Sequence, residues 1–266
     1  MRRLTLLLAA ASALSLSGCG VVKDMRAEYV ANRALVQARM ELLSPQPDRE
    51  KAVEKLDLVF RLRSNDPEFL QQLAGPYQML GESGRALECL EPLRADAPLA
   101  YKTSAAPLLM ELGEMERGEQ LLDEALTEGR AKYGLDTPRQ LAMVLNNVGY
   151  CIVDAGVRVE EGMVLIEEAV ALQPLEPNYI DSLGWALYRQ GESKRAAFHL
   201  ERAARLLPGN SSPEVLWHLG AVHARLRHFR RAEWELKQAL SLDPSNEEAR
   251  RMLRGLQLEL PVPARV

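Results

Sequence analysis

The residues of this sequence that could carry catalytic or metal-binding chemistry are few, and their spacing does not suit it. The four histidines, His199, His218, His223 and His228, all lie in the last third of the 266 residues. Ligands to one ion on a helix are typically three or four residues apart, because those positions share a face, whereas His218 and His223 are five apart. We interpret all four as scattered residues of polar helix faces. The sequence also lacks a phosphate-binding loop and a nucleophile elbow, so we expect no catalytic residues, no cofactor and no metal.

Cys19 is the one residue whose surroundings indicate a chemical modification. Arg2 and Arg3 precede an apolar run of 13 residues, which has the length of a signal peptide and falls short of the about 20 residues that span a bilayer. The run ends in Leu16-Ser17-Gly18-Cys19, which resembles the bacterial lipobox. That resemblance implies a lipoprotein signal peptide over residues 1–18, cleavage before Cys19, and lipidation of its sulfur and new amine. The alternative is ordinary secretion with Cys19 as a free thiol.

The residue after the cysteine and the overall charge bear on the expected location and partners. Gly20 stands where enteric bacteria place the aspartate that retains lipoproteins at the inner membrane, which favours the periplasmic face of the outer membrane. Loss of residues 1–18 takes the formal charge from −4 to −6, and an acidic chain argues against nucleic acid as a partner. No later stretch is apolar enough to cross a membrane. We therefore expect a lipid anchor, which holds a protein stably at the membrane when it carries several acyl chains.

The elements that position the remaining residues follow a repeat. Residues 177–210 predict two amphipathic helices that are broken at Gln190-Gly191-Glu192. Small residues mark the places where the two helices can approach closely, and Pro208 ends the pair. Counting from Gly184, these marks fall at offsets of 12, 16, 19 and 24 residues, at Ala196, Leu200, Ala203 and Pro208. The same offsets from Gly220 give Ala232, Leu236, Ala239 and Pro244. Weaker copies start at Ala74, Ala106 and Gly149.

A helix–turn–helix unit of about 34 residues is the hallmark of one repeat family. The pattern resembles the tetratricopeptide repeat (TPR) and covers residues 67–246 as five repeats. The resemblance implies an all-α fold, a right-handed superhelical solenoid with about six helix pairs and a C-terminal capping helix. Residues 19–66 supply the lipidated N-terminus and a degenerate first pair, with helices expected at 23–43 and Arg49–Arg63. Residues 247–266 supply the capping helix, expected to end near Gln257, and a tail.

Prolines and cysteines give two further expectations. Pro92 and Pro107 fall inside expected helices, where a proline costs about 3 kcal/mol unless the helix bends, so we expect the superhelix to bend near Pro107. Cys89 and Cys151 lie two repeats apart on the repeat map. In a solenoid each unit touches only its neighbours, and a disulfide needs Cα atoms within about 7 Å. We interpret both as buried thiols.

The concave face of the first helices is the expected binding surface, because TPR solenoids usually bind extended peptides or partner helices there. Positions three or four residues from the packing marks point into this groove, and aromatic residues with arginine are typical of binding hot spots. The alternative is that Trp185 and Trp217 only fill gaps between repeats. Asn146, Tyr150 and Asp181 stand where chaperone-binding TPRs need Lys, Asn and Arg, which argues against chaperone tails as ligands. The predicted groove residues are Gln71, Gln78, Asn146, Tyr150, Asp181, Trp185, Tyr188, Arg189, Trp217 and Arg225.

The lipobox and the repeats together predict a non-enzymatic scaffold for protein–protein interaction, anchored to the outer membrane. The combination resembles TPR lipoproteins that help to assemble pili or secretion systems, such as pilotin and Tad-type proteins. The expected partners are envelope proteins held in the groove, and the membrane held through the lipid. The alternative function is an accessory regulator of a peptidoglycan or exopolysaccharide synthesis or export machine.

Overall fold

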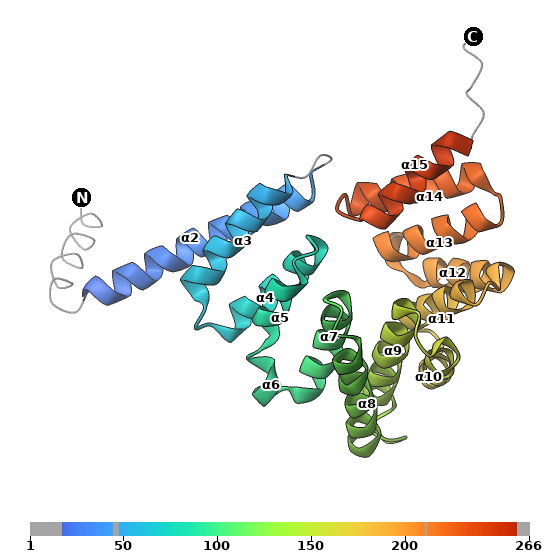
Figure 1. Cartoon of the computed structure of the whole chain (residues 1–266), viewed down its shortest axis with the longest axis horizontal. Helices are drawn as coiled ribbons and strands as arrows, with labels where there is room; N and C mark the ends of the chain where they lie inside the picture. Colours follow the sequence, from blue (N-terminus) through green and yellow to red (C-terminus); the bar gives the residue numbers. More distant parts are fainter. Residues whose placement is uncertain (1–17, 45–47, 211, 260–266) are drawn as a thin grey trace, which may run out of the picture.

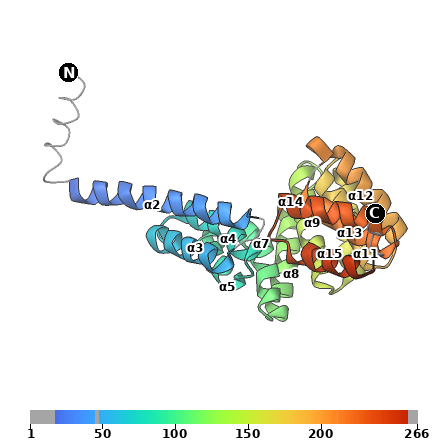
Figure 2. The same cartoon turned by 90° about the horizontal axis from the view of Figure 1, so that it is seen from above.

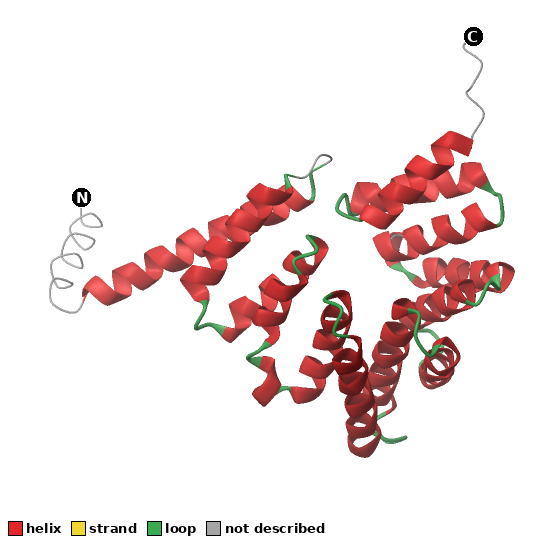
Figure 3. Cartoon of the chain, viewed as in Figure 1, coloured by secondary structure: helices red, strands yellow, loops and turns green. Residues whose placement is uncertain are grey.

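The chain folds into helix pairs that follow one another along an arc (Figure 1). The structure is a computed structural model that describes residues 18–44, 48–210 and 212–259. Figure 2 shows the first part of helix α2 projecting away from the other helices, and Figure 3 shows that the described residues form helices and loops with no strand among them. The helices are α2 (Gly18–Leu42), α3 (Arg49–Arg63), α4 (Pro67–Met79), α5 (Ser83–Leu90), α6 (Leu93–Asp96), α7 (Pro98–Glu111), α8 (Met115–Lys132), α9 (Pro138–Ala155), α10 (Val159–Leu172), α11 (Pro177–Arg189), α12 (Ser193–Leu206), α13 (Pro213–Arg225), α14 (Phe229–Leu242) and α15 (Glu247–Glu259).

Within the described residues these helices form six pairs and a cap, which confirms the predicted all-α TPR solenoid. The first helix of each of the five repeats starts with a proline, where its missing N–H would have no helical partner in any case. Asp66 and Ser212 cap two of these helices through their side chains. Thr137, at the N-cap of α9, makes no such hydrogen bond and instead accepts one from the Gly134 N–H.

The turn within each repeat needs a left-handed backbone. Glycine supplies it at Gly81, Gly113, Gly156 and Gly191, with φ between 70° and 89°. The last repeat has Arg227 at the equivalent position, with φ of 63°. A residue with a Cβ atom is strained in this conformation, so this turn departs from the pattern of the others.

Close helix contact inside the repeats occurs where the sequence places small residues. A Cβ atom on Gly184 would lie 2.6 Å from Leu200 Cγ, and one on Gly220 would lie 2.6 Å from Leu236 Cγ. A Cβ atom on Gly149 would lie 2.7 Å from the carbonyl oxygen of Gly162. The marks on which the repeat was identified are therefore packing contacts.

Of the two prolines that were predicted to lie inside helices, one does and the other does not. Pro107 lies inside α7. Pro92 was predicted inside a helix, and this is wrong: α5 ends at Leu90 and the short α6 begins at Leu93, with Pro92 at its N-cap. The cause is the missing N–H and the clash of the ring with the preceding turn. The second helix of the first repeat is therefore split.

The N-terminal helix is also longer than expected, since α2 begins at Gly18 rather than near residue 23. The opening pair and the cap approach each other across the arc, where Arg49 Nη1 lies 3.6 Å from Glu247 Oε1. Both side chains are about half exposed, so this pair marks the contact without contributing much stability. None of the described helices is both long and apolar enough to cross a membrane.

Candidate binding groove

Two adjoining cavities lie on the side of the arc formed by the first helices of the repeats. One has a volume of about 510 Å³ and the other about 550 Å³, which is within the range of about 300–1,000 Å³ for ligand sites. Glu111 of α7 and Asp154 of α9 line both. The first cavity is also lined by Gln78, Pro107, Met110, Met115, Tyr150, Cys151, Ala155 and Glu214. The second is also lined by Trp185, Arg189, Trp217, Glu248, Arg251 and Met252.

The capping helix takes part in the second cavity. Glu248, Arg251 and Met252 of α15 line it together with Glu111 of α7, although three helix pairs of the chain separate these two helices. The superhelix therefore winds far enough to bring its end over the groove. We call the two cavities together the concave groove.

Aromatic rings form the wall of the groove on α11 and α13. The ring of Trp185 stacks on that of Tyr188 at 5.0 Å and lies 5.2 Å from that of Trp217. Trp185 Nε1 donates a hydrogen bond to Asp154 Oδ1 at 3.0 Å. The side chains of Trp185 and Trp217 are only 5% and 9% exposed. They therefore pack between repeats and also present an edge to the cavity.

A polar cluster joins three first helices beneath this wall. His218 Nδ1 lies 3.0 Å from both carboxylate oxygens of Asp181, and the imidazole stacks on Trp185 at 4.3 Å. Burial alone would lower the pKa of His218, but the charge and hydrogen bond of Asp181 outweigh it and raise the pKa. The Tyr150 hydroxyl donates to Glu214 Oε1 at 3.1 Å. Burial raises the pKa of the Glu214 carboxyl.

The cluster resembles a metal site in spacing, since ligand atoms of Asp181, Glu214 and His218 lie within 4.8 Å of one another. Each carboxylate already has a partner in the protein: Asp181 is paired with His218, and Glu214 accepts a hydrogen bond from Tyr150. A buried charge without a partner costs free energy, so a carboxylate inside the protein needs a partner such as His218. We therefore assign the cluster a structural role between repeats.

The structure brings five predicted groove residues to the cavities: Gln78, Tyr150, Trp185, Arg189 and Trp217. Asn146 and Asp181 are buried below the surface, and Asn146 Oδ1 has no hydrogen-bond partner in the described part of the chain. Tyr188 and Arg225 line neither cavity. Arg225 packs over the ring of Tyr188 and donates to the Tyr188 carbonyl oxygen. Gln71 is exposed and lines neither.

Sequence reasoning missed Glu111, Asp154 and the residues of the capping helix. A signal for the first two was present: each lies five residues after a packing mark, Ala106 or Gly149, as Arg189 lies five residues after Gly184. The same offset therefore points into the groove in three successive repeats. The cap carries no repeat mark, so nothing in the pattern could have placed Arg251 or Met252.

The interpretation of all four histidines as residues of polar faces is wrong for two of them. His218 and His223 are 1% and 2% exposed. His223 Nδ1 lies 2.6 Å from Glu235 Oε2, which is itself buried. Both histidines are buried because a carboxylate on a neighbouring helix pairs with them, and helical spacing alone does not show such a partner.

The two cysteines are free thiols. Cys89 is buried as predicted, and Cys151 is half-buried at the edge of the first cavity. Burial raises the pKa of each thiol to about 12. Since the thiolate is the reactive form, neither is suited to act as a nucleophile at neutral pH.

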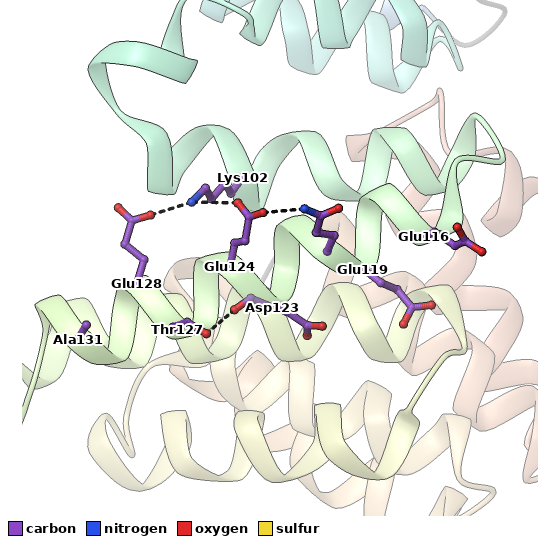
Figure 4. Close-up of a pocket in the computed structure, with 9 residues that line it drawn as sticks. Lys102, Glu116, Glu119, Asp123, Glu124, Thr127, Glu128 and Ala131 are labelled. Atoms are coloured by element: carbon purple, nitrogen blue, oxygen red, sulfur yellow. Dashed lines mark hydrogen bonds and ion pairs between the residues drawn. The ribbon is translucent and has the colours of Figure 1, made fainter.

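A larger depression of about 780 Å³ lies on the opposite side, along the surface of α8 (Figure 4). All but one of its lining residues belong to that single helix. Lys102 of α7 reaches across to Glu124 and Glu128 at 3.2 and 3.0 Å, which raises the pKa of the lysine. The carboxylates that line this depression are exposed or paired with cations, so we interpret the depression as a solvated helix surface.

Comparison with known proteins supports the repeat assignment. None of the protein-family models matches the sequence. A stretch of 79 residues is 40% identical to a TPR repeat-containing protein of Pseudomonas aeruginosa, and it spans 30% of this chain and 13% of that protein. A thermophilic TPR protein of Thermus thermophilus has a TM-score of 0.55 at 18% identity, over 72% of this chain and 99% of that one. A tetratricopeptide repeat protein of Parabacteroides merdae has a TM-score of 0.61 at 15% identity, over 87% of this chain and 84% of that one. At these identities the two structures show a common fold.

Proposed function

We propose that this TPR solenoid is a scaffold that binds a segment of an envelope protein in its concave groove. TPR proteins generally mediate protein–protein interaction and are typically not enzymes. The observation that carries the proposal is the pair of adjoining cavities, which α7, α9, α11, α13 and the cap line together. A continuous groove over several repeats suits an extended peptide or a helix better than a small molecule.

The lining of the groove indicates the chemistry of that segment. Its charged residues are the carboxylates Glu111, Asp154, Glu214 and Glu248 and the guanidinium groups of Arg189 and Arg251. Arg189 already donates to the Asp154 carbonyl oxygen at 2.8 Å. Met110, Met115 and Met252 add apolar surface that adapts to its ligand. A partner segment with Lys or Arg beside an apolar side chain would complement this surface.

Charge reversal tests the groove. Glu111→Lys with Glu248→Lys should weaken capture of the partner from detergent-solubilised membranes by about tenfold or more, because like charges across an interface are strongly unfavourable. The matched control is Glu160→Lys with Glu167→Lys on α10, which makes the same net change at exposed positions away from the groove. Equal capture by the groove variant and the control would contradict this binding site.

The anchor part of the proposal is a lipid on Cys19 that holds the scaffold at the periplasmic face of the outer membrane. Its support is the lipobox in the sequence; residues 1–17, and with them Leu16 and Ser17, lie outside the described residues. Helix α2 includes Cys19, so little chain separates the anchor from the first pair. An anchored scaffold of this kind would assist assembly of an envelope complex, such as a pilus or secretion system.

Metabolic labelling tests the anchor. A palmitate analogue should label the wild-type protein, and Cys19→Ala should abolish the label and move the protein from the membrane to the soluble fraction. Cys89→Ala is the matched control, because that thiol is buried and has a pKa of about 12. An unlabelled wild-type protein in the soluble periplasm would exclude the lipid anchor.

A further inference from the structure

Two large aromatic side chains are exposed at equivalent positions of the last two repeats. Phe198 of α12 lies 14 residues after Gly184, and Trp234 of α14 lies 14 residues after Gly220. Their exposed fractions are 61% and 59%. Both helices lie on the outer side of the solenoid, since neither contributes to the concave groove. Equivalent positions of successive repeats place the two rings on one surface.

Basic residues hold three of the four positions at helical spacing from each ring, and Glu201 and Gln238 hold the others. Lys194, Arg195 and Arg202 lie three or four residues from Phe198, and Arg230, Arg231 and Lys237 lie three or four residues from Trp234. Residues at these spacings share a helix face. Arg231 Nη2 lies 2.8 Å from Glu201 Oε1, which connects α14 to α12 on this side. Arg205 lies seven residues after Phe198 and shares the same face of α12. We call Phe198, Trp234, these six basic residues and Arg205 the basic–aromatic face.

The same outer surface has the opposite charge one repeat earlier. Val164 of α10 occupies the position equivalent to Phe198 and is 58% exposed. Its neighbours at the same spacings are all acidic: Glu160, Glu161, Glu167 and Glu168. The basic–aromatic face is therefore a local feature of the last two repeats and not a general property of outer helices in this chain.

Several cations near the rings are not neutralised within the protein. In the described part of the chain no carboxylate oxygen lies within 4.0 Å of Lys194, Arg205 or Arg230. Exposed aromatic rings among basic side chains match the boundary between lipid headgroups and acyl chains, where rings insert and long cationic side chains reach the phosphates. The two rings lie on helices of successive repeats, and the surface of a bilayer can contact both rings at once.

We propose that the basic–aromatic face binds the surface of an anionic phospholipid bilayer. This contact is separate from the concave groove and from the lipid on Cys19. It would turn the outer helices of the last two repeats toward the membrane. The groove and the membrane contact would then use different sides of the same repeats.

The test uses the full chain with Cys19→Ala, so that no acyl chain contributes. Binding is measured to vesicles of phosphatidylcholine and to vesicles that also contain an equimolar amount of phosphatidylglycerol. Lys194→Glu, Arg205→Glu and Arg230→Glu together should weaken binding to the anionic vesicles by about a hundredfold. The matched control reverses Arg61, Arg139 and Arg254, three exposed arginines outside the face.

Tryptophan fluorescence tests insertion of the ring. Of the three tryptophans, Trp234 is exposed and the other two are buried. Brominated lipid should therefore quench mainly Trp234, and Trp234→Phe should remove that quenching.

Two results of the binding test would overturn the proposal. An equal loss of binding in the control variant would show that only the net charge of the protein matters. Binding to soluble polyglutamate but not to vesicles would assign the face to an acidic protein and would also overturn it.

Discussion

At the scale of single residues, the buried pair of His218 and Asp181 shows what a sequence pattern leaves out. The position of His218 on a helix was correctly inferred, but its burial depends on a carboxylate 37 residues away on another helix. Asp181 was likewise assigned to the groove surface from its position on one helix, and it is buried. Spacing along one helix shows on which face of the helix a residue lies. Whether that face is exposed to solvent depends on how the neighbouring helices pack.

The pair makes the stability of the last repeats depend on pH. The pKa of His218 is raised above its ordinary 6.5 by Asp181, with Glu214 and Asp154 nearby, in spite of burial. A raised folded-state pKa contributes stability that is fully present below pH 6.5 and is lost as the pH rises through the folded value. The pKa of Glu214 is also raised above its ordinary 4.5. Its ionisation therefore also lowers the stability of the folded state as the pH rises above 4.5.

We expect the urea midpoint of the wild type to fall as the pH is raised above 6.5. His218→Leu should lose the part of this dependence that His218 contributes, and should cost about 3–5 kcal/mol near pH 6, because Asp181 is left as an unpaired buried charge. The control is His228→Leu, an exposed position where a change of about 0.5 kcal/mol or less is expected. A pH profile of His218→Leu parallel to that of the wild type would contradict the pairing.

At the scale of elements, the helix pairs were predictable because local rules and packing agree. The interval Arg49–Arg63 was predicted and is observed, and proline starts and glycine turns bound the repeat helices. The broken helix at Pro92 and the early start of α2 were not predicted. The break lies at a proline, whose ring and missing N–H interrupt the helix. The first part of α2 projects away from the other helices (Figure 2), so no packing mark indicates where it starts.

The close approach of two backbones at Gly149 and Gly162 gives a direct test of the repeat packing. Gly149→Ala should destabilise the protein by about 1–3 kcal/mol, because the new Cβ would lie 2.7 Å from a carbonyl oxygen that cannot move freely. Gly75→Ala is the matched control, with nothing within 4 Å of its new Cβ. In a helix interior that change should stabilise by up to about 1 kcal/mol. Urea unfolding of both variants would decide, and equal shifts would contradict the assigned contact.

At the scale of the whole molecule, the sequence indicated a groove but not that the capping helix lines one end of it. Small rotations between repeats add up along the chain, and the cap reaches α7 only after three further helix pairs. The offset that marks Glu111 and Asp154 could have been found from the repeat, whereas the part of α15 that completes the second cavity could not. The acidic character of the groove and the basic–aromatic face likewise become visible only when residues of several repeats are placed side by side.

Site-specific photo-crosslinking tests the central claim, that partners bind in the concave groove. A photoreactive residue is placed at Gln78 or Glu248, which line its two cavities, or at Thr127 or Glu160, which are exposed on α8 and α10. After irradiation of intact cells, Gln78 and Glu248 should yield a crosslinked product with the same partner, and the two outer positions should yield none. A partner crosslinked from the outer positions, with none from the groove, would contradict the account.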